Sequence, residues 1–399
     1  MRIGIFISNP HPEVGGGHIF ENDIITDFLK KVSDIKDHEF YIIHREKNLD
    51  ENKVENSKKF KFLYAPKNNF FDKISENLKR YFIGSPFFSN IKGPIERLAN
   101  KNKLDIIWFV SGYYYEAMDI PYIATVFDLQ HRTQPWLPEI NNNGEWARRE
   151  LNYRYFLSRA SYVIIGTEIG REEIQLFYQI PKFRIHKLPH PTPSYILDSD
   201  NKNSAFIKNK YNLPENFVFY PAQFWPHKNH INLLFALKTI QKKYNLKLNL
   251  VLTGSDKGNL SYVKKIINEL DLSKQVYILG FVPKDEMAAF YKSSSMLAFV
   301  SLCGPENLPP LEAFLIKCPV VASKIQGSEE QLGHSVLFCN PTNPEDIADK
   351  IFELFSNEKL RNELVEKGFE RAISWKASNF SEGVLKIIDQ FSDIRRNWE

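Results

Sequence analysis

Residues 304–316 read GPENLPPLEAFLI, a turn that leads into an apolar, helix-like run. Pro309 and Pro310 have no N–H group, so they remove two of the free donors at the start of that helix. An anion would therefore be held by amides of the turn, and the turn offers those of Glu306, Asn307 and Leu308. This pattern is suited to binding the phosphates of a ligand.

Glu312 follows in or near the first turn of the same helix. A carboxylate there repels phosphate but accepts hydrogen bonds well from a pair of ribose hydroxyls. The alternative is a surface glutamate that complements the helix dipole. Glu306 is a second carboxylate in the stretch, six residues before Glu312.

A lysine stands at a similar strand-to-helix junction in residues 217–234, FVFYPAQFWPHKNHINLL. Lys228 precedes the helix and can reach a diphosphate as a point charge. Lysines before helices are common, so the assignment draws its weight from residues 304–316, which we expect at the same end of the same sheet.

Glycines Gly15, Gly16 and Gly17 follow the first apolar run and precede a helical pattern. Such a loop lets the backbone approach a phosphate at a helix N-terminus. A flexible loop that closes over a ligand is an equally good interpretation. The run is not GxGxxG, which disfavours a dinucleotide site.

Asp128 and His131 lie in TVFDLQH, at the expected carboxyl end of a strand, where α/β proteins place their sites. His131 can donate to a sugar hydroxyl or a phosphate, and Asp128 can orient it or cap the following turn. The alternative is a turn aspartate with a packed histidine. His18 is open to the same two interpretations.

Composition narrows the class of protein. The 399 residues exceed one compact core, and a net charge of +4 is too small to indicate nucleic-acid binding. No apolar run reaches bilayer length, and the N-terminus lacks a signal-peptide pattern, so we expect a cytoplasmic protein. Basic stretches in the first half leave peripheral contact with an anionic membrane open. Buried side chains rather than a disulfide or metal site are expected for Cys303, Cys318 and Cys339.

Apolar runs alternate with helical patterns along the chain, which predicts α/β architecture with doubly wound parallel sheets. The pattern lapses near residues 196–206, so we expect domains over 1–198 and 199–380, with 381–399 as a C-terminal helix. The cleft between the two domains is the default site. A well-capped helix is expected after Asn343, with Pro344 at N1 and Asp346 at N3.

The C-terminal half resembles retaining GT-B glycosyltransferases of the large family of bacterial mannosyl- and glucosyltransferases. The resemblance rests on PAQFWPHKNHINLL, on LVLTGS followed by ILGFVPKDEM, and on GPENLPPLEAFLIKCPVVASKIQG. These motifs cover about half of the chain in the family's order, and the N-terminal half agrees more loosely. The resemblance implies two Rossmann-like domains facing across a cleft, with the last helix (near residues 380–396) packing back on the first domain.

The resemblance also implies roles for particular residues. Donor diphosphate binding falls to Lys228, Gly16, Gly17, Gln223, Asn307 and Leu308. Ribose and base contacts fall to Glu312, Gly254, Phe281 and Val282. The donor sugar would meet Glu306, and His131 or Asp128 would face the transferred sugar as catalytic residues.

Three positions depart from the family's pattern. The first motif glutamate, eight residues before Glu312, is Gly304 here. The arginine often found before the loop lysine is replaced by Gln223 or is missing. The usual His-Asp pair reads Phe127-Asp128, with the histidine three residues later.

The expected activity is transfer of a sugar, with retention, from a nucleotide-diphosphate donor to a glycan or lipid-linked acceptor, as in bacterial surface polysaccharide synthesis. Mannose from GDP-mannose is the first choice of donor, with UDP- and dTDP-sugars next. No DxD-like acidic cluster appears, so we expect no metal and no other cofactor. Alternatives are another GT-B enzyme, such as an epimerase or a phosphorylase, and a nucleotide- or sugar-binding protein that has lost its chemistry.

Overall fold

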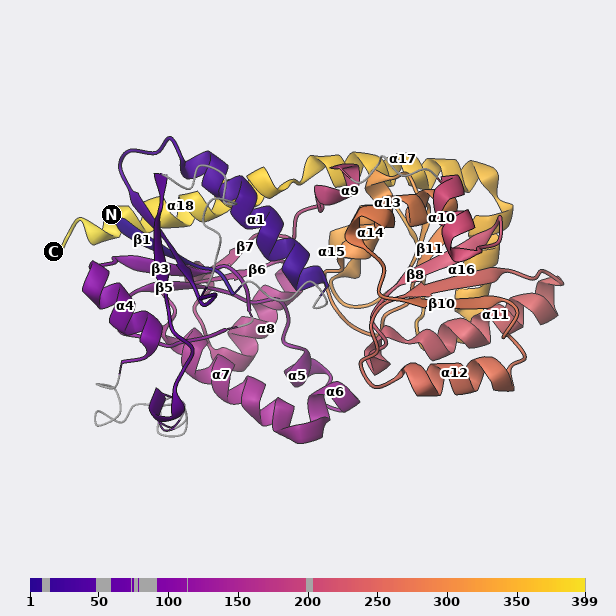
Figure 1. Ribbon diagram of the computed structural model, residues 1–399, viewed down its shortest axis with the longest axis horizontal. Coiled ribbons are helices and arrows are strands. Elements are labelled where there is room, and N and C mark those ends of the chain that lie inside the picture. Colours follow the sequence, from indigo (N-terminus) through magenta and orange to yellow (C-terminus); the bar gives the residue numbers. More distant parts are fainter. Residues whose placement is uncertain are drawn as a thin grey trace. The chain divides into compact units, whose positions relative to one another are not determined.

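The structure is a computed structural model that describes residues 1–8, 15–47, 59–72, 74, 78, 92–112, 114–198 and 204–398. It contains two compact units (Figure 1). Unit 1 comprises Met1–Trp136, Ile140–His190 and Ala377–Glu399, and unit 2 comprises Leu137–Glu139 and Pro191–Lys376. The boundary expected between 198 and 199 adjoins residues 199–203, which lie outside the described residues. The basic stretches of the first half also fall partly outside them.

Unit 1 is built on a seven-stranded parallel sheet in the order β3-β2-β1-β4-β5-β6-β7. The strands are β1 Arg2–Phe6, β2 Glu39–His44, β3 Lys61–Tyr64, β4 Ile106–Phe109, β5 Tyr122–Thr125, β6 Tyr162–Ile165 and β7 Ile185–Lys187. The strand order reverses between β1 and β4, and such a reversal opens a crevice at the carboxyl ends of the strands.

The longer helices of unit 1 cover both faces of this sheet. They are α1 Gly16–Val32, α4 Pro94–Asn102, α7 Glu145–Arg159, α8 Glu168–Tyr178 and α18 Ala377–Arg395. Shorter elements are α5 Gln130–Thr133, α6 Pro138–Asn141, η4 Asn142–Gly144 and η5 Lys182–Arg184, and α6 runs across the unit boundary. Strand residues are apolar on both faces, as a sheet covered on two sides requires.

Two apolar clusters flank the unit 1 sheet. Phe109 packs on one face with Phe156 of α7, and Trp108 packs on the other with Phe28 of α1. Phe380 of α18 also belongs to the second cluster. This packing confirms the prediction that the last helix returns to the first domain.

Unit 2 repeats the design with a six-stranded parallel sheet in the order β10-β9-β8-β11-β12-β13. The strands are β8 Phe217–Pro221, β9 Asn249–Thr253, β10 Val276–Gly280, β11 Met296–Phe299, β12 Val320–Ser323 and β13 Leu337–Cys339. The order reverses between β8 and β11. Two doubly wound parallel units confirm the predicted fold class.

The helices of unit 2 alternate with these strands along the chain. They are α9 Tyr195–Asp198, α10 Ser204–Tyr211, η6 Pro226–Lys228, α11 His230–Tyr244, α12 Leu260–Glu269, η7 Lys284–Glu286, α13 Met287–Ser293, α14 Leu308–Leu315, α15 Ser328–Leu332, α16 Pro344–Ser356 and α17 Glu358–Ser374. No helix among the described residues is long and apolar enough to cross a membrane.

Candidate functional site

The reversal of strand order in unit 2 brings two predicted motifs together. Lys228 ends η6, in the segment that follows β8, and Asn307 lies in the loop that follows β11. The Nζ atom of Lys228 lies 3.4 Å from Oδ1 of Asn307 and 5.2 Å from the centre of the Phe299 ring. The sequence places these residues 79 positions apart. Parallel β8 and β11 are neighbours, which is why their carboxyl ends meet.

Buried hydrogen bonds fix the segment that carries Lys228. Tyr220 of β8 donates its hydroxyl to the Lys228 carbonyl at 2.6 Å. Asn229 adopts a left-handed conformation (φ 59°) and donates its amide to the carbonyls of Val300, at 2.9 Å, and Pro341, at 2.7 Å. Asn229 therefore ties the start of α11 to the chain that leaves β11.

Asn307 fills the space where Gly304 lacks a side chain. Gly304 has φ 99°, and a Cβ atom built on it would lie 3.1 Å from Oδ1 of Asn307. The Nδ2 group of Asn307 donates to the Gly304 carbonyl at 2.6 Å. Gln331 of α15 holds the Asn307 backbone, at 2.9 Å to its amide and 3.1 Å to its carbonyl. The Asn307 side chain therefore lies against the backbone of Gly304, on the side where a Cβ atom would project.

Gly254 allows the ends of three strands to approach one another. It follows β9 with φ 142°, and a Cβ atom there would lie 2.4 Å from the Ala222 carbonyl oxygen. Its amide donates to the Gly280 carbonyl at 2.7 Å. Gln223, beside Ala222, accepts a hydrogen bond from the Trp225 indole at 2.9 Å. Gly254 and Gln223 therefore lie at the same edge of the sheet as Lys228.

The remaining predicted residues of unit 2 differ in exposure. Phe281 is 54% exposed after β10, whereas Val282 and Leu308 are buried. Glu306 is half-buried in the turn before α14. Glu312 is only 3% exposed, and its carboxylate accepts hydrogen bonds from the hydroxyls of Tyr195, at 2.8 Å, and Tyr291, at 2.7 Å. The two tyrosines could not be paired with Glu312 from the sequence.

In unit 1, Asp128 follows β5 and is half-buried. Its Oδ1 accepts the Gln130 amide at 3.0 Å, so the carboxylate bonds the backbone of the turn that leads into α5. The Arg149 guanidinium of α7 lies 3.4 Å from the same oxygen. Asp128 is therefore placed at the carboxyl end of the sheet with an arginine partner.

His131 has no exposed surface. Its Nε2 lies 2.9 Å from the Tyr178 hydroxyl and 3.3 Å from Glu150, and its ring stacks on Tyr153 at 5.3 Å. Burial lowers the pKa of His131 to about 4. This placement gives His131 a packing role and argues against direct contact with a sugar.

Two residues that the sequence did not single out lie near Asp128. His190 packs between Phe20, at 4.6 Å, and Phe127, at 5.3 Å, and burial lowers its pKa to about 4. Burial, with the nearby Asp128 charge, raises the pKa of Glu173 to about 7. His190 follows β7 and could have been noticed as a second histidine at a strand end; Glu173 lies within α8 and carried no signal.

The glycine run and a hydroxyl cluster occupy the reversal between β1 and β4. Gly16 and Gly17 open α1 after Gly15, which has φ 79°. Ser8 follows β1, and its hydroxyl donates to Glu21 of α1 at 2.7 Å. The Ser111 hydroxyl, after β4, lies 2.9 Å from that of Ser8. Residues 9–14, between these elements, lie outside the described residues.

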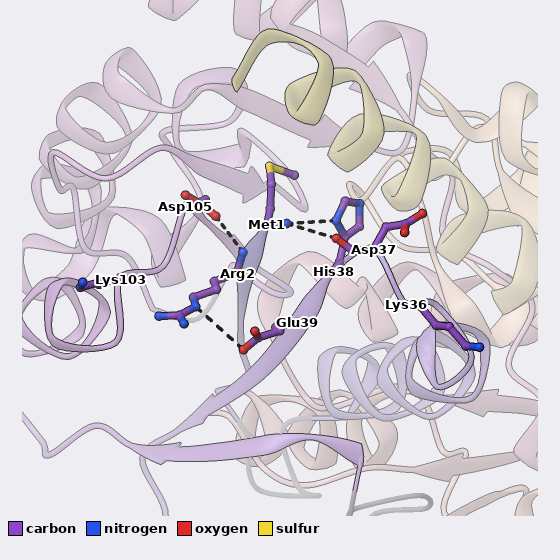
Figure 2. A pocket seen from close by; sticks show the side chains of 8 residues that line it. All are labelled: Met1, Arg2, Lys36, Asp37, His38, Glu39, Lys103 and Asp105. Carbon is purple, nitrogen blue, oxygen red and sulfur yellow. Dashed lines mark hydrogen bonds and ion pairs between the residues drawn. The ribbon is translucent and has the colours of Figure 1, made fainter. Parts of the chain in front are cut away.

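A cavity of about 500 Å³ lies at the opposite, amino-terminal edge of this sheet (Figure 2). Some of its lining residues bond to one another. The Arg2 guanidinium lies 3.9 Å from Glu39, and the Arg2 amide donates to Asp105 at 2.7 Å. None of the site residues predicted from the sequence lines this cavity.

Residues 201–371 match the family described as "Glycosyl transferases group 1". An uncharacterized glycosyltransferase of Methanocaldococcus jannaschii (MJ1178) is 32% identical over 212 residues, 49% of this chain and 57% of that protein. The serotype-specific mannosyltransferase WbdA of Escherichia coli is 24% identical over 199 residues, 48% of this chain and 24% of that protein. The chain thus spans less than two thirds of either relative.

Among solved structures, Anabaena Alr3699/HepE in complex with UDP and glucose aligns with a TM-score of 0.69 at 14% identity. The alignment covers 98% of this chain and 100% of HepE. This likeness extends over both units and identifies the fold as GT-B. The similarity to the glycosyl transferases group 1 family lies in residues 201–371.

Proposed function

We propose that this protein transfers a sugar from a nucleoside-diphosphate donor to a glycan or lipid-linked acceptor. The observation that carries the proposal is the meeting of Lys228 and Asn307 where β8 and β11 end. An ammonium group beside the glycine turn that carries Asn307 suits a diphosphate. Parallel α/β sheets bind ligands at such a reversal of strand order.

In this proposal the donor binds to unit 2, and its diphosphate leaves as the bond to the sugar breaks. Lys228 and the turn formed by Asn307 and Leu308 stabilise the developing negative charge. No metal is needed, because the lysine and this turn supply the charge complement. Transfer retains the configuration of the sugar, as the family resemblance implies.

Asp128 is the better placed of the two proposed catalytic residues. It is half-buried at the carboxyl end of β5, whereas His131 has no exposed surface. We therefore assign Asp128 to the transferred sugar or the acceptor, and His131 to holding the turn through Tyr178 and Glu150.

Mannose from GDP-mannose is the donor we propose first. The name of E. coli WbdA, a mannosyltransferase, supports this donor. The word "serotype-specific" in the same name supports an acceptor in bacterial surface polysaccharide. UDP-sugars rank next, because HepE was solved with UDP and glucose.

We also propose that the protein works at the inner face of the membrane, because the acceptors of surface polysaccharide synthesis are often lipid-linked. Phe70 and Phe71 of unit 1 are both exposed, which supports peripheral contact with the membrane.

The first test is a melting-temperature screen with GDP, UDP, dTDP and ADP, since a ligand that binds only the folded form raises the melting temperature. Titration calorimetry with the best nucleotide then compares the wild type with Lys228→Ala. Loss of a charge-assisted bond should weaken binding by about 1.5–3 kcal/mol. Binding should weaken because, among the hydrogen bonds of the described residues, Lys228 is the one cationic group that bonds the Asn307 side chain.

Lys247→Ala is the matched control. It removes the same charge from an exposed lysine just before β9, at the amino-terminal edge of the same sheet. Nucleotide affinity should stay unchanged in this variant. Equal affinities of the Lys228 variant and the wild type would exclude a diphosphate role for Lys228.

A second candidate is a protein that binds the nucleotide sugar without transferring it. Gly304, with Asn307 in place of a carboxylate, is the observation that favours it. Incubation of each nucleotide sugar with an acceptor extract separates the two. Release of free nucleoside diphosphate supports the transferase, and binding with no turnover supports the binding protein.

A further inference from the structure

The carboxylate of Glu312 accepts hydrogen bonds from two tyrosines. One oxygen accepts the Tyr195 hydroxyl at 2.8 Å, and the other accepts the Tyr291 hydroxyl at 2.7 Å. Burial, with the Glu312 charge, raises the pKa of Tyr291 well above its usual range, so that hydroxyl stays a donor. Glu312 is thus recognised by hydroxyl groups, the chemistry that a ribose also offers.

A ribose cannot simply be added to this arrangement. Glu312 is 3% exposed, so its carboxylate oxygens are shielded from solvent. Each carboxylate oxygen has two lone-pair sites, but a ligand needs a path to them. One of the two tyrosines must leave for a ribose hydroxyl to reach the carboxylate.

Tyr291 and Tyr195 differ in how they are held. Tyr291 has no exposed surface and packs edge-on against Phe219 of the central strand β8, at 5.2 Å. Tyr195 is 8% exposed and begins the four-residue helix α9, just after Pro191–Ser194. A short helix at the start of unit 2 can shift at lower cost than a side chain inside the core.

Tyr195 also lies beside the loop predicted to contact the base. The Nζ atom of Lys284 lies 4.1 Å from the centre of the Tyr195 ring. Lys284 begins η7, two residues after Val282. Tyr195 thus contacts both the Glu312 carboxylate and the segment that follows Phe281 and Val282.

We propose that Tyr195 is a donor-site residue whose hydroxyl occupies the place of a ribose hydroxyl on Glu312 and leaves when a nucleoside diphosphate binds. The inference rests on the proposed function, since it takes Glu312 as the ribose ligand. Tyr291 remains on the other oxygen and holds the carboxylate in place. The exchange is of one hydroxyl donor for another, so no charge is left unpaired.

The exchange determines which nucleotide sugars suit the site. A ribonucleotide returns a hydroxyl donor to Glu312 and can offer a second one. A 2′-deoxynucleotide offers one hydroxyl fewer and repays less of the bond that Tyr195 gives up. The protein should therefore prefer ribonucleoside diphosphates to their 2′-deoxy counterparts.

Tyr195→Phe tests the exchange, because it removes the hydroxyl and keeps the ring under Lys284. Without that donor, ribose binding no longer has to break the hydrogen bond between Tyr195 and Glu312. Calorimetry with the nucleoside diphosphate that most raises the melting temperature should give about 3- to 10-fold tighter binding. Tyr244→Phe, the matched control, removes a hydroxyl that donates to Asp349 at 2.8 Å at the end of α11, so its affinity should stay within about 2-fold of the wild type.

If the wild type binds the nucleoside diphosphate and Tyr195→Phe binds it equally or more weakly, the inference is overturned and the proposed function stands. A wild type that binds none of the nucleotides overturns both. The wild type alone gives a second measurement, UDP against 2′-deoxy-UDP. About 3- to 10-fold weaker binding of the deoxynucleotide supports the exchange, and equal binding overturns it.

Discussion

Gly304 carries a backbone conformation that few other residues adopt. Its φ of 99° lies in the left-handed region, and the Asn307 amide fills the volume a side chain would need. A glutamate at this position would be strained and would collide with Asn307. The turn between β11 and α14 is therefore built around the absence of a side chain, and Asn307 supplies the polar group instead.

Gly304→Ala should destabilise unit 2 by about 1–3 kcal/mol, since the new methyl group is held at an unfavourable φ and presses on Asn307. Urea unfolding measures the cost. The same variant should weaken nucleotide binding, because Asn307 lies beside Lys228.

Gly258→Ala separates the two causes. Gly258 has φ 97°, close to that of Gly304, but a Cβ atom there meets nothing within 4 Å. It should carry the backbone cost alone and leave nucleotide affinity intact. Equal losses of affinity in both variants would show that the contact with Asn307 has no part in binding.

Helix starts show what the sequence can and cannot predict. The start of α16 is predicted from NPED alone, and the Asn343 side chain accepts the amides of Glu345 and Asp346 as expected. The start of α4 has no side-chain cap of its own. Glu116 caps it instead, accepting the amides of Ile95 at 3.2 Å and Glu96 at 2.8 Å. A local pattern reveals the first cap, whereas the second depends on chain folding over twenty residues.

The same distinction holds for the site. Lys228, Gly254 and Asn307 come together because each follows a strand of one parallel sheet, which strand alternation predicts. The tyrosines on Glu312 come from α9 and α13, and nothing in their local sequence marks them. A packed His131 was one of two interpretations left open by the sequence, which could not choose between them because its burial depends on α7 and α8 packing over it.

Glu116→Ala should destabilise unit 1 by about 2–3 kcal/mol. Two backbone amides at the start of α4 would lose their acceptor, and the Tyr114 hydroxyl, at 3.0 Å, would lose a partner. Urea unfolding followed by far-UV circular dichroism measures the loss. Glu172→Ala, at an exposed position on α8, should stay within about 0.5 kcal/mol of the wild type. If Glu116→Ala also loses less than about 0.5 kcal/mol of unfolding free energy, water caps α4 as well as Glu116 does.

At the scale of the whole molecule, each unit has its own sheet and its own buried core. After Lys376, where unit 2 ends, the chain returns to unit 1 through Ala377–Glu399. In α18, Phe380 is fully buried, with its ring 5.4 Å from that of Phe20 and 6.5 Å from that of Trp108. The core of unit 1 is therefore closed by the last segment of the chain.

Phe380→Ala should cost unit 1 about 3–5 kcal/mol, the usual loss for truncating a buried phenylalanine. Leu354→Ala, in the buried face of α16, should cost unit 2 about 2–5 kcal/mol. In differential scanning calorimetry of the full chain, the two variants should lower different transitions. Nucleotide that binds unit 2 should raise only the transition that Leu354→Ala lowers. If both variants lower one shared transition equally, the units unfold together, and the two cores are not energetically separate.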